Sequence, residues 1–77
     1  MKLTDVFRLH GKALKLLRIN NGYKVGDVAK ALSVSSAYIS QCERSKRILS
    51  EHKTKRFLDF VGISEDEAKQ FVQIMNK

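Results

Sequence analysis

Residues 28–43 read VAKALSVSSAYISQCE, and this stretch decides the fold. Its apolar residues recur at helical spacing on both sides of a break at 33–35, where Ser35 can cap the helix that follows. The spacing predicts one short helix over about 25–32 and another over about 36–44. Two short helices joined by a tight turn cross steeply, and the second is then exposed enough to enter a DNA major groove.

The residues before this pair predict a longer first helix, from about residue 4 to about residue 20, with Thr4 as its cap. Gly22 ends the helix, because glycine tolerates the left-handed conformation found at helix C-termini. The apolar stripe of this helix, at 3.6-residue spacing, comprises Leu3, Val6, Phe7, His10, Ala13, Leu14 and Leu17.

Two more helices are predicted after the pair. Ser50 caps the fourth helix, which ends at Gly62, and its apolar stripe is Phe57, Phe60 and Val61. Ser64 and Glu67 form a capping box at the start of the fifth, whose stripe is Ala68, Phe71, Val72 and Met75. The sequence shows no strand-like alternation. We therefore expect an all-α fold, a single domain over residues 1–77 with five helices around one core.

The charge is distributed unevenly along the chain. Its 15 Lys and Arg residues outnumber its 8 Asp and Glu residues, which gives a net charge of +7. Residues 1–56 hold thirteen basic and four acidic side chains, whereas residues 57–77 hold two basic and four acidic ones. A basic body with a slightly acidic end suits a polyanionic partner held by one face. The alternative is that the lysines only keep a small domain soluble.

Other features narrow the class of protein. The single cysteine, Cys42, fits a reducing compartment and a buried core position better than redox sensing. No signal peptide or stretch of ~20 apolar residues is present, so a cytoplasmic location without membrane association is expected. His10 and His52 have no partners at metal-ligand spacing. The sequence also shows no nucleophile that is accompanied by a base and an orienting acid. We therefore expect no metal, no cofactor and no enzymatic activity.

Residues 28–43 resemble the helix-turn-helix of the Cro and lambda-repressor-like (XRE-type) transcriptional regulators. The matching residues are Ala29, Leu32, Val34, Ser35, Ile39, Ser40, Gln41, Glu43 and Arg44. Further matches extend the resemblance to about residues 13–64: Leu14, Leu17, Arg18, Gly22, Lys46, Arg47, Ser50, Gly62, Ile63 and Ser64. The resemblance implies a five-helix lambda-repressor-like DNA-binding domain.

The sequence departs from that family at several positions. Val25 stands where a glutamine usually opens the second helix and helps to anchor the recognition helix and a phosphate. Ser33 replaces the usual turn glycine, and Ser45 and Leu49 replace a glycine and a proline in the basic loop. In the fourth helix, Glu51 and Thr54 are polar where the family is often apolar.

The resemblance also implies which residues contact DNA. Base contacts fall on the exposed side of the 36–44 helix, at Ser36, Ala37, Ser40, Gln41 and Arg44. Gln41 is the strongest of these, because its amide can pair bidentately with adenine N6 and N7. Phosphate contacts fall on Lys24, Tyr38, Lys46 and Arg47. Tyr38 has an alternative role as a half-buried support for the preceding helix. Arg18 is expected to pair with Glu43.

These features predict a sequence-specific double-stranded DNA-binding regulator, a phage or bacterial repressor that acts as a homodimer on a two-half-site operator. The surface for the dimer or for a protein partner is predicted to comprise Leu9, Leu16, Ile19, Phe71, Ile74 and Met75. For Leu9, Leu16 and Ile19, the alternative is that the last helix of the domain covers them. Two other functions stay open. One is the antitoxin or accessory autoregulator of a two-gene cassette, and the other is a helix-turn-helix module that docks a larger regulator.

Overall fold

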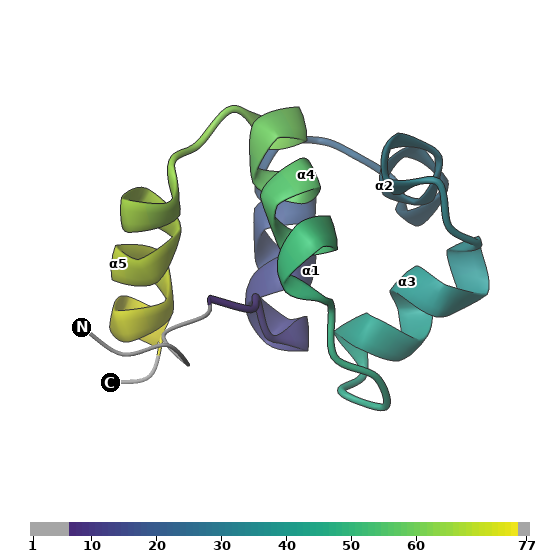
Figure 1. Ribbon diagram of the computed structural model, residues 1–77, viewed down its shortest axis with the longest axis horizontal. Helices are drawn as coiled ribbons and strands as arrows, with labels where there is room; N and C mark the ends of the chain where they lie inside the picture. The colour runs from purple at the N-terminus through teal and green to yellow at the C-terminus, as the bar shows by residue number, and fades with distance from the viewer. Residues whose placement is uncertain (1–6, 76–77) are drawn as a thin grey trace.

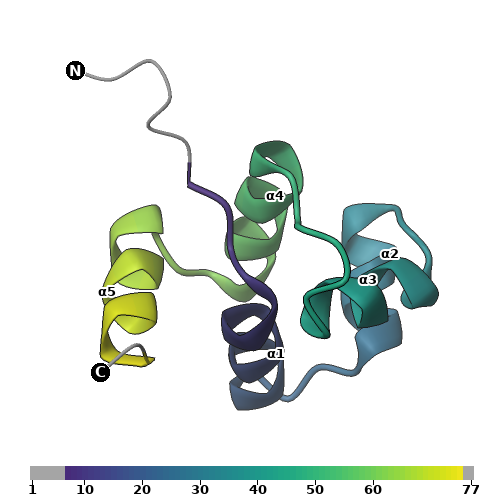
Figure 2. The same cartoon turned by 90° about the horizontal axis from the view of Figure 1, so that it is seen from below.

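Five helices make up the fold in the computed structural model of the chain, which describes residues 7–75. They are α1 (Gly11–Asn20), α2 (Val25–Leu32), α3 (Ser36–Glu43), α4 (Glu51–Val61) and α5 (Glu65–Met75), and no strand occurs between residues 7 and 75. In both views α1 and α4 lie in the middle, with α2 and α3 on one side and α5 on the other (Figures 1 and 2). The predicted all-α class is confirmed.

The core lies where the first four helices meet, and α5 closes one side of it. Phe57 on α4 is the largest fully buried side chain, and Ala68 is the only residue of α5 in the buried core. The rest of the α5 stripe is only partly buried. The buried core consists of Leu9, Ala13, Leu14, Leu17, Val28, Ala29, Leu32, Ile39, Cys42, Leu49, Phe57, Leu58 and Ala68.

The predicted caps of α3, α4 and α5 are confirmed by their hydrogen bonds. The Ser35 hydroxyl accepts from the Tyr38 amide at 3.0 Å, and the Ser50 hydroxyl accepts from the Lys53 amide at 3.1 Å. At α5 the capping box is complete, because Glu67 donates its amide to the Ser64 hydroxyl and accepts from the Ser64 amide. Each cap satisfies an amide that the first helical turn leaves without a partner.

The prediction that the first helix starts at Thr4 is wrong. Residues 7–10 are not helical, and α1 starts at Gly11 with His10 as its cap, whose Nδ1 accepts from the Ala13 amide at 3.4 Å. The Leu9 amide instead donates to Thr54 Oγ1 on α4 at 3.2 Å, while the Leu9 side chain is buried. This bond to α4 takes the place of the i→i−4 hydrogen bond that a helix would give the Leu9 amide. Leu3, Thr4 and Val6 lie outside the described residues.

Candidate nucleic-acid interface

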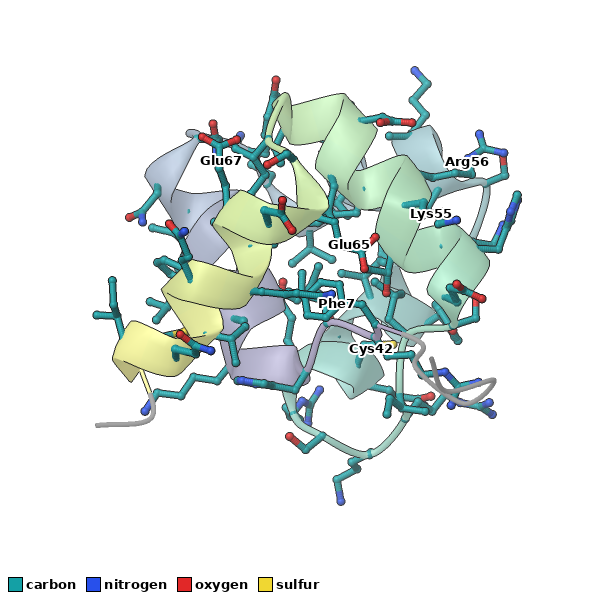
Figure 3. The ribbon with its side chains drawn as sticks, turned by 60° about the vertical axis from the view of Figure 1, so that its left-hand side comes forward. Phe7, Cys42, Lys55, Arg56, Glu65 and Glu67 are labelled. Atoms are coloured by element: carbon teal, nitrogen blue, oxygen red, sulfur yellow. The ribbon has the colours of Figure 1, made fainter. Side chains whose placement is uncertain are left out.

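The turn between α2 and α3 sets the direction of α3. Ser33 adopts the left-handed conformation at φ 60° and ψ 44°, where the family usually has glycine, and the Val34 amide donates to the Ala29 carbonyl at 2.9 Å. Two cations of α4 hold the end of α2: Lys53 Nζ donates to the Leu32 carbonyl at 2.8 Å, and Arg56, labelled in Figure 3, donates to the Ala31 carbonyl at 3.1 Å. These contacts fix the helix pair against α4.

One side of α3 is buried and the opposite side is free. Ile39 and Cys42 face the core and are 0% and 1% exposed. At 100° per residue, the residues opposite them are Ala37, Ser40, Gln41 and Arg44. All of these are exposed except Ser40, which is half-buried, and Ser36 is also exposed at the first turn. The sequence-predicted base contacts therefore share one accessible helix face.

The buried side of α3 is tied to α1 by an ion pair. Arg18 Nε and Glu43 Oε2 are 2.6 Å apart, and Arg18 Nη2 donates to Glu43 Oε1 at 3.1 Å. Arg18 Nη1 also donates to the Tyr23 carbonyl at 3.0 Å. The two side chains are 12% and 7% exposed, so the pair is largely desolvated. The predicted Arg18–Glu43 pair is confirmed, and it fixes the last turn of α3.

The loop from α3 to α4 folds back onto Gln41. Its start takes a left-handed turn at Ser45, with φ 62°, at another position where glycine is common in the regulators that this sequence resembles. The amides of Lys46 and Arg47 both donate to the Gln41 carbonyl, at 2.8 and 3.3 Å. Arg47 Nε also donates to Gln41 Oε1 at 2.8 Å. The loop therefore places two exposed cations beside the free side of α3.

Tyr38 and Cys42 lie one helical turn apart on α3. Tyr38 is half-buried against the core, and the Arg47 guanidinium lies over its ring, 5.9 Å from the centroid. Burial raises the pKa of the Tyr38 hydroxyl, which therefore stays protonated and able to donate a hydrogen bond. Burial also raises the pKa of the Cys42 thiol, and a buried protonated thiol is unreactive.

Sequence reasoning missed the contribution of the segment before α1. Arg8 is exposed in this segment, two residues before His10. His10 and Gly11 meet the α3–α4 loop across a cleft of about 230 Å³, lined also by Ser45, Lys46, Arg47 and Ile48. The predicted long helix concealed this arrangement, because it placed His10 inside a helix and not at a helix start beside the α3–α4 loop. The segment before α1 therefore adjoins the basic loop that follows α3.

The remaining predicted site residues lie in different surroundings. Lys24 is exposed at the start of α2, and its amide donates to Asp27 Oδ2 at 2.9 Å. In the predicted dimer or partner surface, Leu9 is 1% exposed and belongs to the core, so its assignment to that surface is wrong. Ile19 and Ile74 are 50% and 69% exposed. The other three, all half-buried, are Leu16, Phe71 and Met75.

A short helix held across a tight turn, with one free face and cations beside it, defines a helix-turn-helix protein, the class that inserts such a helix into the DNA major groove. The sequence model of the helix-turn-helix domain matches residues 11–71, from the start of α1 into α5. The chain belongs to the helix-turn-helix domain family. A comparison with curated proteins finds no match. Within residues 7–75, no helix has both the length and the apolar character needed to cross a membrane.

Proposed function

We propose that the protein is a sequence-specific double-stranded DNA-binding transcriptional regulator, a cytoplasmic repressor that acts as a dimer on a two-half-site operator. The observation that carries the proposal is the free face of α3, with Ala37, Gln41 and Arg44 exposed beside the cations of the following loop. Polar side chains on such a face can read base edges, while neighbouring Lys and Arg side chains neutralise phosphates.

The border of this face favours a polyanion. Four basic side chains are exposed on three segments: Arg8 before α1, Lys24 at the start of α2, and Lys46 and Arg47 in the loop that contacts Gln41 of α3. The one acidic side chain on α3, Glu43, is engaged by Arg18 and is only 7% exposed. Phosphates that approach α3 therefore meet positive charge without opposing carboxylates on that helix.

The test separates base reading from phosphate binding. Gln41→Ala is expected to weaken operator binding by about 1–3 kcal/mol with little effect on unrelated DNA, because one good base contact contributes that much discrimination. Lys46→Ala is the matched variant from the neighbouring loop. It is expected to weaken binding to both DNAs by a similar factor. It should also make the slope of log affinity against log salt concentration shallower by about 0.9. The operator is first selected from a random duplex pool.

Affinities for operator and unrelated duplex, each measured at several salt concentrations, decide the result. A wild-type protein that enriches no sequence from the pool, while remaining folded, would overturn the proposed function. Equal weakening of every duplex by Gln41→Ala would show that Gln41 only binds the backbone. A change of base preference caused by Lys46→Ala would show that the loop itself enters a groove.

A further inference from the structure

The side-chain amide of Gln41 has a fixed orientation. Arg47 Nε lies 2.8 Å from Gln41 Oε1, and a guanidinium nitrogen can only donate. The bonded amide atom must therefore be the carbonyl oxygen, which settles the orientation that an amide otherwise leaves open. The free part of the Gln41 side chain is then its NH₂ group, which carries two donors.

The Arg47 side chain is held in turn by its surroundings. Its guanidinium lies over the Tyr38 ring, at 5.9 Å from the centroid, and its amide donates to the Gln41 carbonyl at 3.3 Å. Tyr38 itself is half-buried against the core. A planar guanidinium with a ring on one side and an amide acceptor at its edge is restrained more than a free surface arginine.

The bonded Gln41 side chain presents two donors beside a positive charge. Its NH₂ group can only donate, and the Arg47 guanidinium holds the charge beside Gln41 Oε1. Adenine offers an N7 acceptor but also the N6 amino donor, which this charge disfavours. Guanine offers two acceptors, N7 and O6, on its major-groove edge, and so matches the donors.

We propose that Arg47 is a positioning residue that orients Gln41 toward guanine, so that base preference at this position is set by the pair and not by Gln41 alone. The inference rests on the proposed function, because it concerns the DNA that this same face reads. It replaces the adenine contact that the sequence predicts for Gln41. A free glutamine amide presents both its carbonyl oxygen and its NH₂ group, whereas the amide bound to Arg47 presents only its NH₂ group.

The experiment compares base preferences among five proteins: the wild type, Gln41→Ala, Arg47→Lys, the double variant of these two, and Lys46→Arg. Arg47→Lys keeps the positive charge and removes the Nε–H donor, and Lys46→Arg is the control for altered cation type in the same loop. The base pair read by Gln41 is the one whose preference Gln41→Ala relaxes. Relative affinities for all four bases at that pair are measured by competition.

The wild type is expected to prefer guanine there, and Arg47→Lys to reduce the guanine-over-adenine ratio by about fivefold or more. Lys46→Arg should leave the ratio unchanged. In the Gln41→Ala background, Arg47→Lys should have no further effect on base preference. A wild-type preference for adenine would overturn the inference, as would an Arg47→Lys effect that persists without Gln41, because Arg47 would then read the base directly.

A measurement without DNA tests the same bond. In the free protein, the Arg47 Nε–H signal in an NMR spectrum is expected to shift on Gln41→Ala and to stay in place on Ser40→Ala. An unchanged signal in Gln41→Ala would show that the bond is absent, whatever the DNA results. Enrichment of no operator would instead overturn the proposed function, so the two failures are distinguishable.

Discussion

At the scale of single residues, Gly11 allows the start of α1 to lie directly against the end of α3. A Cβ atom at this position would collide with the backbone carbonyl oxygens of Cys42 and Glu43 at the end of α3. Backbone atoms cannot move aside as a flexible side chain can. The missing side chain therefore lets α1 start directly against the last turn of the exposed helix.

We expect Gly11→Ala to lower the free energy of unfolding by about 3 kcal/mol, since overpacking of a tight contact typically costs 1–3 kcal/mol and here the obstacle is backbone. Urea unfolding measures the change. Gly26→Ala is the matched control, because a Cβ there meets only Ser36 Oγ at 3.9 Å and alanine favours a helix over glycine. It should stabilise the protein by about 0.5–1 kcal/mol. Equal effects of both substitutions would contradict the close approach.

At the scale of helices, the Arg18–Glu43 ion pair joins α1 to α3. Removing one partner of such a pair leaves an uncompensated, mostly buried charge, which typically costs 3–5 kcal/mol. We expect Glu43→Gln to lower the free energy of unfolding by about 3 kcal/mol. The double variant Arg18→Met with Glu43→Leu should cost less than the sum of its two single changes, because it removes both charges together. A double-mutant cycle in denaturant measures this coupling.

The chain offers a surface pair as the control. Lys69 Nζ lies 3.3 Å from Glu65 Oε2 on α5, and these side chains are 46% and 42% exposed. Lys69 also lies 5.8 Å from the ring of Phe7, a side chain that is labelled in Figure 3. Lys69→Gln should cost about 1 kcal/mol or less, because solvent screens exposed pairs. Similar losses from Glu43→Gln and Lys69→Gln would mean that burial adds nothing to the Arg18–Glu43 pair.

At the scale of the whole molecule, α3 and α5 lie at opposite ends of the longest axis, which measures 36 Å (Figure 1). The exposed Ile74 on α5 is therefore available to a second copy while α3 contacts DNA. We expect footprints of two related half-sites whose centres are a whole number of helical turns apart, at about 34 Å per turn. A single asymmetric half-site, with a monomer bound at saturation, would contradict dimer binding.

The same surface can be tested by substitution. Ile74→Asp is expected to abolish cooperative binding to two half-sites and to preserve binding to one, because a charge is costly in an apolar contact. Gln73→Asp adds the same charge to the neighbouring exposed position of α5 and should leave cooperativity intact. Sedimentation of each variant with operator DNA measures the stoichiometry. Cooperative binding that survives Ile74→Asp would place the dimer contact elsewhere.

The sequence by itself determined the features that depend on neighbours within one helical turn. The bounds of α2, the serine caps of α3 and α4, and the capping box of α5 all follow from residues three or four positions apart. The outward face of α3 follows from the same periodicity, since Ile39 and Cys42 mark its buried side. Local hydrogen bonds and helical spacing are enough to fix such features.

Tertiary structure alone decided where α1 begins and how Gln41 is oriented. Leu9 bonds to Thr54, which is 45 positions away in the sequence, and this bond competes with the helical bonds that local spacing predicts. Gln41 is held by Arg47, whose position depends on the left-handed turn at Ser45 and on the ring of Tyr38. Apolar periodicity records which residues are buried, and it carries no information on which distant polar group completes a hydrogen bond. Leu9 and Thr54 are brought together only when the helices pack, and Gln41 and Arg47 only when the loop after α3 folds back.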